Sequence, residues 1–128
     1  MKKMVLIFSH VLTEKQIEDA EINLGVDEFI YLPKDLQEKW SSIPPQEKDI
    51  SGITKEIKNW LEEVATKGDY VLVQGDYGAT YDLVNFCRAK GLKAVYSTTS
   101  RRAKEIKGQD GKIEITRVFE HVIFREYF

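Results

Sequence analysis

The fold of this chain is decided by residues 69–96, which read DYVLVQGDYGATYDLVNFCRAKGLKAVY. Apolar residues at 70–73 and 92–96 predict two strands, and the segment between them repeats its apolar residues at helical spacing. Gly91 ends the predicted helix. A strand, a helix and a strand at this spacing predict a right-handed crossover between parallel strands.

The N-terminal segments continue the same alternation of strands and helices. Residues 4–8 form a continuous apolar run, which predicts a strand buried on both faces. Residues 13–16, Thr-Glu-Lys-Gln, have the pattern of a capping box, and they predict the start of a helix that Gly25 ends. Residues 28–32 predict the strand that follows this helix.

Two further helices are predicted before the central stretch. Pro33 fits the first turn of a short helix, and residues 53–64 have helical spacing. Residues 41–52 lie between these helices and contain a Pro-Pro pair. They predict a long surface loop rather than a domain boundary, because neither flank could fold alone. Residues 1–128 are therefore expected to form one domain.

The pattern changes after Arg102. Asp110-Gly111 is a hairpin turn signal, residues 112–116 alternate, and residues 118–127 predict a last extended strand. The predicted fold class is α/β, a small Rossmann-like and mostly parallel sheet with helices on both faces. An antiparallel C-terminal extension completes this predicted sheet.

Composition narrows the class of protein. Hydrophobic residues make up 42% of the chain and charged residues 31%, which excludes a disordered or collagen-like chain. No apolar run approaches the roughly 20 residues that span a membrane, and the run at residues 5–8 is too short for a signal peptide. Cys87 is the only cysteine, which excludes an intrachain disulfide. We therefore expect a cytoplasmic protein with no membrane partner.

Charge is distributed unevenly along the chain. Residues 1–85 carry 9 basic and 16 acidic side chains, a net charge of −7, whereas residues 86–128 carry 10 and 5, a net charge of +5. This asymmetry hints at an anionic partner for the C-terminal third. The alternative is that the two parts simply balance each other on a solvated surface.

Three polar segments are predicted to meet at one edge of the sheet. They are the loops at residues 9–12, 74–79 and 97–102, and each follows a predicted parallel strand. Ligands of such sheets bind beyond the carboxyl ends of the strands, near a switch point in strand order. This shared edge is the main functional clue in the residues themselves.

The loop at residues 74–80 runs from a strand into a helix. Gly75 and Gly78 would let backbone N–H groups approach a phosphate at the helix N-terminus, although the glycine spacing is not that of a dinucleotide fingerprint. Asp76 would repel a phosphate, so it is expected to cap the helix or bind a hydroxyl. An ordinary tight turn is the alternative for this loop.

The loop at residues 97–102, Ser-Thr-Thr-Ser-Arg-Arg, offers four hydroxyls and two guanidinium groups. Arginine binds phosphate through paired donors, and hydroxyls add neutral donors. This composition at a strand end predicts an anion-binding segment. The alternative is a solvated loop that precedes the hairpin.

Two histidines are present. His10 directly follows the first strand, where it could act as a general acid or base, although a packing or capping role is the alternative. In a regular strand His121 would share a face with Phe119, Ile123, Arg125 and Tyr127, which could form a stacking surface, a dimer face or a core face. The histidines lack metal-ligand spacing, so we expect no metal and no cofactor.

The chain resembles a small CRISPR-associated protein family with a Rossmann fold, encoded beside type III systems. The resemblance covers nearly the whole chain, and its most specific blocks are Gln74-Gly-Asp-Tyr-Gly-Ala-Thr80 and Phe119-Glu-His-Val-Ile-Phe-Arg125. The other blocks that carry it are Met4–His10, Tyr31–Trp40 and Val95–Arg101. An acidic residue often precedes the loop arginine in this family, whereas this chain has Ser100 there.

Relatives of this kind are ring nucleases. The resemblance implies that the chain binds cyclic tetra-adenylate and cleaves it without a metal, by attack of a ribose 2′-hydroxyl on the adjacent phosphate. This reaction gives a 2′,3′-cyclic phosphate and a 5′-hydroxyl and switches the antiviral signal off. The implied catalytic residues are His10 and Arg101; the implied substrate-binding residues are Ser9, Gln74, Gly75, Asp76, Tyr77, Gly78, Ala79, Thr80, Thr98, Ser100 and Arg102.

A two-fold symmetric ring also suits a homodimer whose equivalent loops face each other, and no long nucleic acid is expected as a partner. Two alternatives remain open. One is a sensor or sponge that holds the cyclic nucleotide without cutting it. The other is a scaffold whose basic C-terminal third binds a protein partner.

Overall fold

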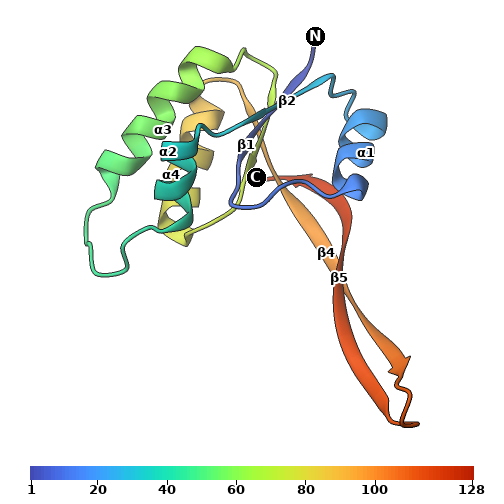
Figure 1. Cartoon of the computed structure of the whole chain (residues 1–128). Coiled ribbons are helices and arrows are strands. Elements are labelled where there is room, and N and C mark those ends of the chain that lie inside the picture. The colour runs from blue at the N-terminus through green and yellow to red at the C-terminus, as the bar shows by residue number, and fades with distance from the viewer.

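The computed structural model describes residues 1–128, with the exception of the Lys104 side chain. Strands and helices alternate along the chain, except that two helices follow each other before the third strand and the last two strands follow each other directly (Figure 1). In chain order the elements are β1 (Lys3–Ile7), α1 (Glu14–Asn23), β2 (Glu28–Tyr31), α2 (Lys34–Ser41), α3 (Ser51–Val64), β3 (Tyr70–Val73), α4 (Tyr77–Ala89), β4 (Lys93–Lys107) and β5 (Ile113–Glu126).

One sheet of five strands runs through the molecule in the order β2-β1-β3-β4-β5. The first three pairings are parallel, and only β4 and β5 pair antiparallel. Helices α2, α3 and α4 cover one face of the sheet and α1 covers the other (Figure 1). The predicted fold class, including the antiparallel C-terminal extension, is confirmed.

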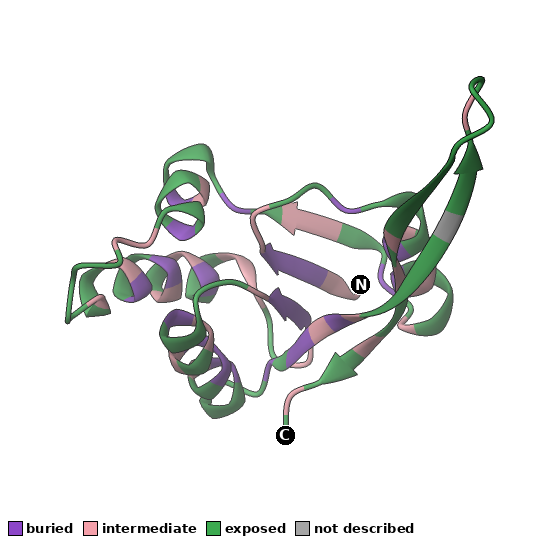
Figure 2. Ribbon diagram, turned by 90° about the horizontal axis from the view of Figure 1, so that it is seen from below, coloured by how far each residue is buried: buried purple, intermediate pink, exposed green. Residues whose placement is uncertain are grey.

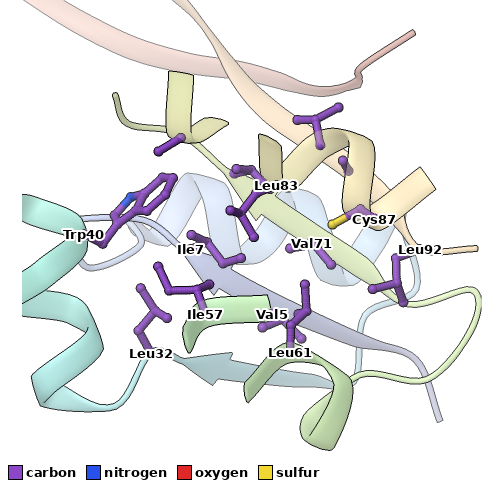
Figure 3. Close-up of a cluster of buried hydrophobic side chains, with 14 of the residues drawn as sticks. Val5, Ile7, Leu32, Trp40, Ile57, Leu61, Val71, Leu83, Cys87 and Leu92 are labelled. Atoms are coloured by element: carbon purple, nitrogen blue, oxygen red, sulfur yellow. The ribbon is translucent and has the colours of Figure 1, made fainter. Parts of the chain in front are cut away.

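Two cores lie on the two faces of this sheet. Strands β1 and β3 are buried on both sides, so their alternate residues contribute to different cores. On the larger core Val5, Ile7 and their neighbours pack against α2, α3 and α4, as Figure 3 shows. On the smaller core Leu6 and Leu72 pack with Ala20 of α1. Continuous apolar runs are the expected sequence of strands buried in this way.

The helix starts follow local chemistry. The Thr13 hydroxyl accepts a hydrogen bond from the Gln16 backbone, and the Gln16 side chain accepts one from the Thr13 N–H, so the predicted capping box is present. Asp76 caps α4 through a 3.0 Å hydrogen bond from the Ala79 N–H. Asp76 thereby satisfies one of the free donors at that helix end.

The loop predicted at residues 97–102 is wrong: these residues belong to β4, which continues to Lys107. Their partner is β5, a single strand where the sequence suggested two extended segments. Both faces of this stretch are polar, so the alternation that identifies a half-buried strand is missing. The backbone N–H and C=O groups of this stretch form their hydrogen bonds with β5, although its side chains are not buried in the core.

A β-bulge interrupts this pairing. Ser97 lies opposite Phe124, and Thr99 lies opposite His121, so β5 contains one more residue than β4 across the same interval. The bulge changes the alternation of β5, and therefore His121 packs with Phe124, with ring centroids 4.5 Å apart, rather than sharing a face with Ile123. The expectation of one regular face from Phe119 to Tyr127 is wrong for this reason.

Beyond the bulge the two strands leave the body of the molecule as a twisted two-stranded ribbon (Figure 2). We call β4 from Thr99 and β5 up to His121, with the turn between them, the ribbon. Asp110-Gly111 lies in the predicted turn, and Gly111 has a φ of +80°. In the part of the chain that the structure describes, none of the helices is both long enough and apolar enough to cross a membrane.

Candidate functional site

A cleft of about 350 Å³ opens at the carboxyl edge of the parallel strands. The segments that follow β1 and β3 and the middle of β4 meet there, although they are far apart in the sequence. This is the edge at which the sequence predicted a ligand site. Eight residues line the cleft: Phe8, Ser9, His10, Gln16, Gln74, Gly75, Ser97 and Thr99.

His10 and Ser9 form the β1 side of the cleft. His10 is exposed, and its ring packs edge-on against Phe8 with a centroid distance of 5.3 Å. An exposed imidazole at the cleft margin is free to exchange protons with a bound ligand. The sequence prediction that Ser9 and His10 lie at the same edge as Gln74 and Gly75 is therefore consistent with this geometry.

Gln74 ties the floor of the cleft together. Its backbone N–H donates to the Ile7 carbonyl at 3.1 Å, and its side-chain oxygen accepts from the Ser97 N–H at 2.8 Å. The Trp40 indole N–H donates to the Gln74 carbonyl at 3.0 Å. These bonds join β1, β3, β4 and α2 at one residue, which fixes the position of the cleft floor.

Gly75 is required by packing. A Cβ atom added to Gly75 would lie 2.7 Å from the Trp40 ring, closer than side-chain carbons approach one another. The sequence suggested that Gly75 leaves space for a phosphate, and the structure adds a steric reason inside the protein. Gly78 differs, since a Cβ there would meet only the Asp76 carboxylate at 3.5 Å, an ordinary contact.

A second depression of about 370 Å³ shares Gln74 and Gly75 with the cleft. Its other lining residues are Tyr77, Thr80, Tyr96 and Tyr127, so it is rich in aromatic rings. We call it the tyrosine depression. The Thr80 hydroxyl is buried and, among the atoms that the structure describes, has no hydrogen-bond partner. Buried hydroxyls are usually paired, so this unpaired oxygen is an exception.

The β4 residues divide between the two sides of the strand. Ser97 and Thr99 line the cleft, whereas the Thr98 hydroxyl turns to β5, where it bonds both the carbonyl and the N–H of Ile123 at 3.1 Å. Thr98 therefore holds the bulge together. Thr98 was predicted to lie with the residues of the cleft, but the structure places its hydroxyl against β5.

Arg101, Ser100 and Arg102 lie beyond the cleft, on the ribbon. The Arg101 guanidinium lies 5.1 Å from the centroid of the Phe119 ring directly across the ribbon. Arg102 approaches Glu120, with 3.8 Å between its Nε and a carboxylate oxygen. The two arginines are therefore exposed ribbon residues, and the cleft of the same chain is built without them.

A chain of hydrogen bonds that the sequence did not suggest runs from the cleft through β5 to α1. The Ser97 hydroxyl lies 2.5 Å from Nδ1 of His121, and Nε2 of His121 lies 2.7 Å from an Asp19 carboxylate oxygen. The His121 side chain is only 4% exposed. Asp19 and His121 are 102 positions apart, and the one signal nearby, the Gln16 capping box, indicates a helix start only.

Cys87 lies outside this site. It is fully buried in the larger core, and burial raises the pKa of its thiol to about 12. A thiol with this pKa carries almost no thiolate at neutral pH, and the thiolate is the nucleophilic form. Cys87 is therefore a core residue.

Comparisons with known proteins identify relatives without a described activity. Residues 2–125 match the profile of the family described as Uncharacterized protein MJ1673. A protein of Methanocaldococcus jannaschii, described by the same words, is 58% identical over 127 residues, which cover 99% of this chain and 98% of that protein. No solved structure matches the chain.

Proposed function

We propose that this chain, which belongs to the MJ1673 family, is a ring nuclease that binds and cleaves cyclic tetra-adenylate. One observation carries the proposal: polar residues from the ends of β1 and β3 and from β4 surround a single cleft at the ligand-binding edge of a Rossmann-like sheet. The resemblance to CRISPR-associated ring nucleases supplies the substrate. The same resemblance implies that the activity ends signalling in a type III system.

The tyrosine depression supports a nucleotide as the ligand. Adenine bases stack on aromatic rings, and the rings of Tyr96 and Tyr127 lie with centroids 4.8 Å apart beside Gln74 and Gly75. Tyr77, on the other side, is 94% exposed. A nucleotide whose ribose and phosphate lie in the cleft could thus stack its base on the rings of the tyrosine depression.

The reaction that we propose needs no metal. A ribose 2′-oxygen forms a bond to the adjacent phosphorus while the bond from phosphorus to the 5′-oxygen breaks. His10 is positioned at the cleft margin, where it would give a proton to the departing 5′-oxygen. Positioning of the attacking hydroxyl and stabilisation of the pentacoordinate phosphate supply the rest of the rate enhancement.

Arg101 has a role in this proposal only if two copies act together. Within one chain it lies on the ribbon, beyond the cleft. In a homodimer with a two-fold axis, the ribbon of one protomer would carry Arg101 to the ring bound by its partner. There the guanidinium would stabilise the charge that develops on the phosphate. The exposed apolar residues of the ribbon support such an association.

The test is incubation of labelled cyclic tetra-adenylate with the protein and excess chelator, followed by chromatography of the products. We expect a linear product that ends in a 2′,3′-cyclic phosphate. We expect His10→Ala and Arg101→Ala to reduce the single-turnover rate about 100-fold each, because both lose transition-state interactions. Lys67→Ala, a substitution far from the cleft, is the matched control.

Binding without product would identify a sensor or sponge instead of a nuclease. Absence of both binding and product would favour the scaffold alternative and remove the nucleotide from the function. Unchanged rates in Arg101→Ala alone would leave the reaction standing and remove the arginine from it.

A further inference from the structure

The hydrogen-bond chain behind the cleft has one fixed direction. The Thr13 N–H donates to the Gln16 side-chain oxygen at 2.9 Å, so the amide nitrogen of Gln16 must be the group that faces the Ser97 hydroxyl at 3.3 Å. The Asp19 carboxylate can only accept when it is ionised, so it takes the proton on Nε2 of His121. In the neutral ring Nδ1 then carries no proton and accepts the Ser97 O–H.

This direction leaves Ser97 with one unused acceptor position. A hydroxyl oxygen has one proton and two lone pairs. The proton goes to His121, and Gln16 occupies one lone pair, so the second lone pair is available. Ser97 also lines the cleft beside His10. A hydroxyl of a ligand in the cleft can therefore donate a hydrogen bond to the Ser97 oxygen.

We propose that Ser97, His121 and Asp19 form a proton relay that deprotonates the attacking 2′-hydroxyl. This inference rests on the proposed function and deepens it. The 2′-oxygen gives its proton to the Ser97 oxygen as it bonds to phosphorus, and Ser97 passes its own proton to Nδ1 of His121. Asp19 stabilises the imidazolium that forms. Each proton lost at one atom arrives at the next, and His10 supplies the proton that the 5′-oxygen needs.

Ser97 is the catalytic residue in this arrangement, because it is the member that touches the substrate. His121 and Asp19 act through it. The His121 ring is enclosed, with Phe124 at 4.5 Å on one side and Asp19 on the other. Among the side chains that the structure describes, the other charged groups near Asp19 and His121 are Lys15, Glu18, Glu120 and Arg102. Lys15 and Arg102 both approach Glu120, and the hydrogen-bonded partner of the imidazole is Asp19.

The same bonds also join α1 to β4 and β5, so the test must separate a relay from a structural link. The variants are Ser97→Ala, His121→Ala and Asp19→Asn, each assayed for single-turnover cleavage of cyclic tetra-adenylate. Glu18→Gln is the matched control for Asp19→Asn, since Glu18 lines the same surface without a bond to His121. Ser97→Thr keeps the hydroxyl and serves as the conservative variant.

We expect Ser97→Ala, His121→Ala and Asp19→Asn to cleave about 100-fold more slowly, the loss typical of a missing proton acceptor. We expect Glu18→Gln to stay within a few-fold of the wild type, and Ser97→Thr, which keeps the hydroxyl, to cleave faster than Ser97→Ala. Added imidazole should restore His121→Ala at least several-fold, and the rise of rate with pH in the wild type should be absent from this variant without imidazole. A purely structural link predicts neither effect.

Binding of cyclic tetra-2′-deoxyadenylate, which lacks the attacking hydroxyl, reports folding and affinity independently of the reaction. If His121→Ala does not bind this analogue, Asp19→Asn decides, because its side chain has nearly the same shape. Wild-type cleavage together with undiminished rates in Asp19→Asn and no rescue by imidazole overturns the relay and leaves the proposed function intact. Absence of cleavage by the wild type overturns both.

Discussion

Strand β3 in the body and strand β5 in the ribbon use the same kinds of apolar residue with opposite outcomes. Tyr70–Val73 is buried at every position between two layers of helices. On β5, Ile115 and Phe119 are 67% and 61% exposed. Two differences account for this: helices cover both faces of β3, whereas the ribbon projects away from the helices (Figure 2), and β5 places charged residues between its apolar ones. The apolar residues of β3 thus stabilise the body by burial, whereas those of the ribbon remain available to a partner.

The largest effect is expected when one apolar side chain is removed from each of the two regions. Leu72→Ala should lower the free energy of unfolding by about 2–5 kcal/mol, because it leaves a cavity at a fully buried position. Ile115→Ala should change it by less than about 0.5 kcal/mol, because its side chain is already largely hydrated. Urea unfolding at low protein concentration measures both. Equal losses would show that the ribbon is part of the cooperative core.

How far the sequence predicted the structure follows the same division. Residues 4–8 and 70–73 are apolar without interruption, and Thr13 and Gln16 cap a helix locally, so the body could be predicted. Residues 97–107 were harder, because neither face is buried by the rest of the chain and no periodicity marks the strand.

The site divides in a similar way. Ser9, His10, Gln74 and Gly75 could be placed at one edge because parallel strands end at the same edge of a sheet. The contact of His121 with Ser97 and Asp19 could not, because it depends on the bulge in β5, which changes which side chains face the core. A one-residue shift in register has no signal in the local pattern.

A second prediction concerns the two glycines of the strand-to-helix turn. Gly75→Ala should destabilise the protein by about 1–3 kcal/mol, because its methyl group would displace the Trp40 ring. Thermal unfolding followed by tryptophan fluorescence measures this loss. Gly78→Ala, in the first turn of α4, is the control and should be neutral or slightly stabilising, since alanine favours helix and its Cβ has room. The reverse order would contradict the steric role of Gly75.

A third prediction concerns the ribbon as an interface. Phe119 and Ile115 lie on β5 opposite Arg101 and Glu105, on the exposed part of the ribbon. A Phe119→Glu substitution should weaken self-association at least tenfold, about 1.4 kcal/mol, since a charge would have to be buried between the copies. Light scattering over a dilution series measures the change. Tyr81→Glu, an exposed aromatic position on α4, is the control.

The smallest expected effect is electrostatic and belongs to the body. Burial alone would raise the pKa of Asp82, but hydrogen bonds from Lys58 and Thr54 outweigh it and hold the pKa below its ordinary value. A lowered carboxyl pKa stabilises the folded state above the unfolded pKa of about 3.9, and this stabilisation disappears as the pH falls through the folded value.

Asp82→Asn should therefore lower the melting temperature at pH 7 slightly. The loss in the free energy of unfolding should be less than about 1 kcal/mol, because the Lys58–Asp82 pair is partly exposed. The wild type and this variant should melt alike once the pH is well below the folded pKa. A difference that persists in acid would assign the effect to packing. The partly exposed Lys39 and Glu56 pair on α2 and α3 provides a comparison through Glu56→Gln.

The bulge between Ser97 and Thr99 also sets how the molecule can vary in length. Everything that builds the cleft and its polar chain lies at the bulge or on the body side of it. Beyond the bulge the residues pair one to one, as Arg102 does with Val118. The ribbon can therefore be shortened or lengthened by deleting or inserting one residue in each strand. Such paired changes leave the register of β4 and β5 at the cleft unchanged. The length of the ribbon could therefore differ among related proteins while the residues of the cleft keep their positions.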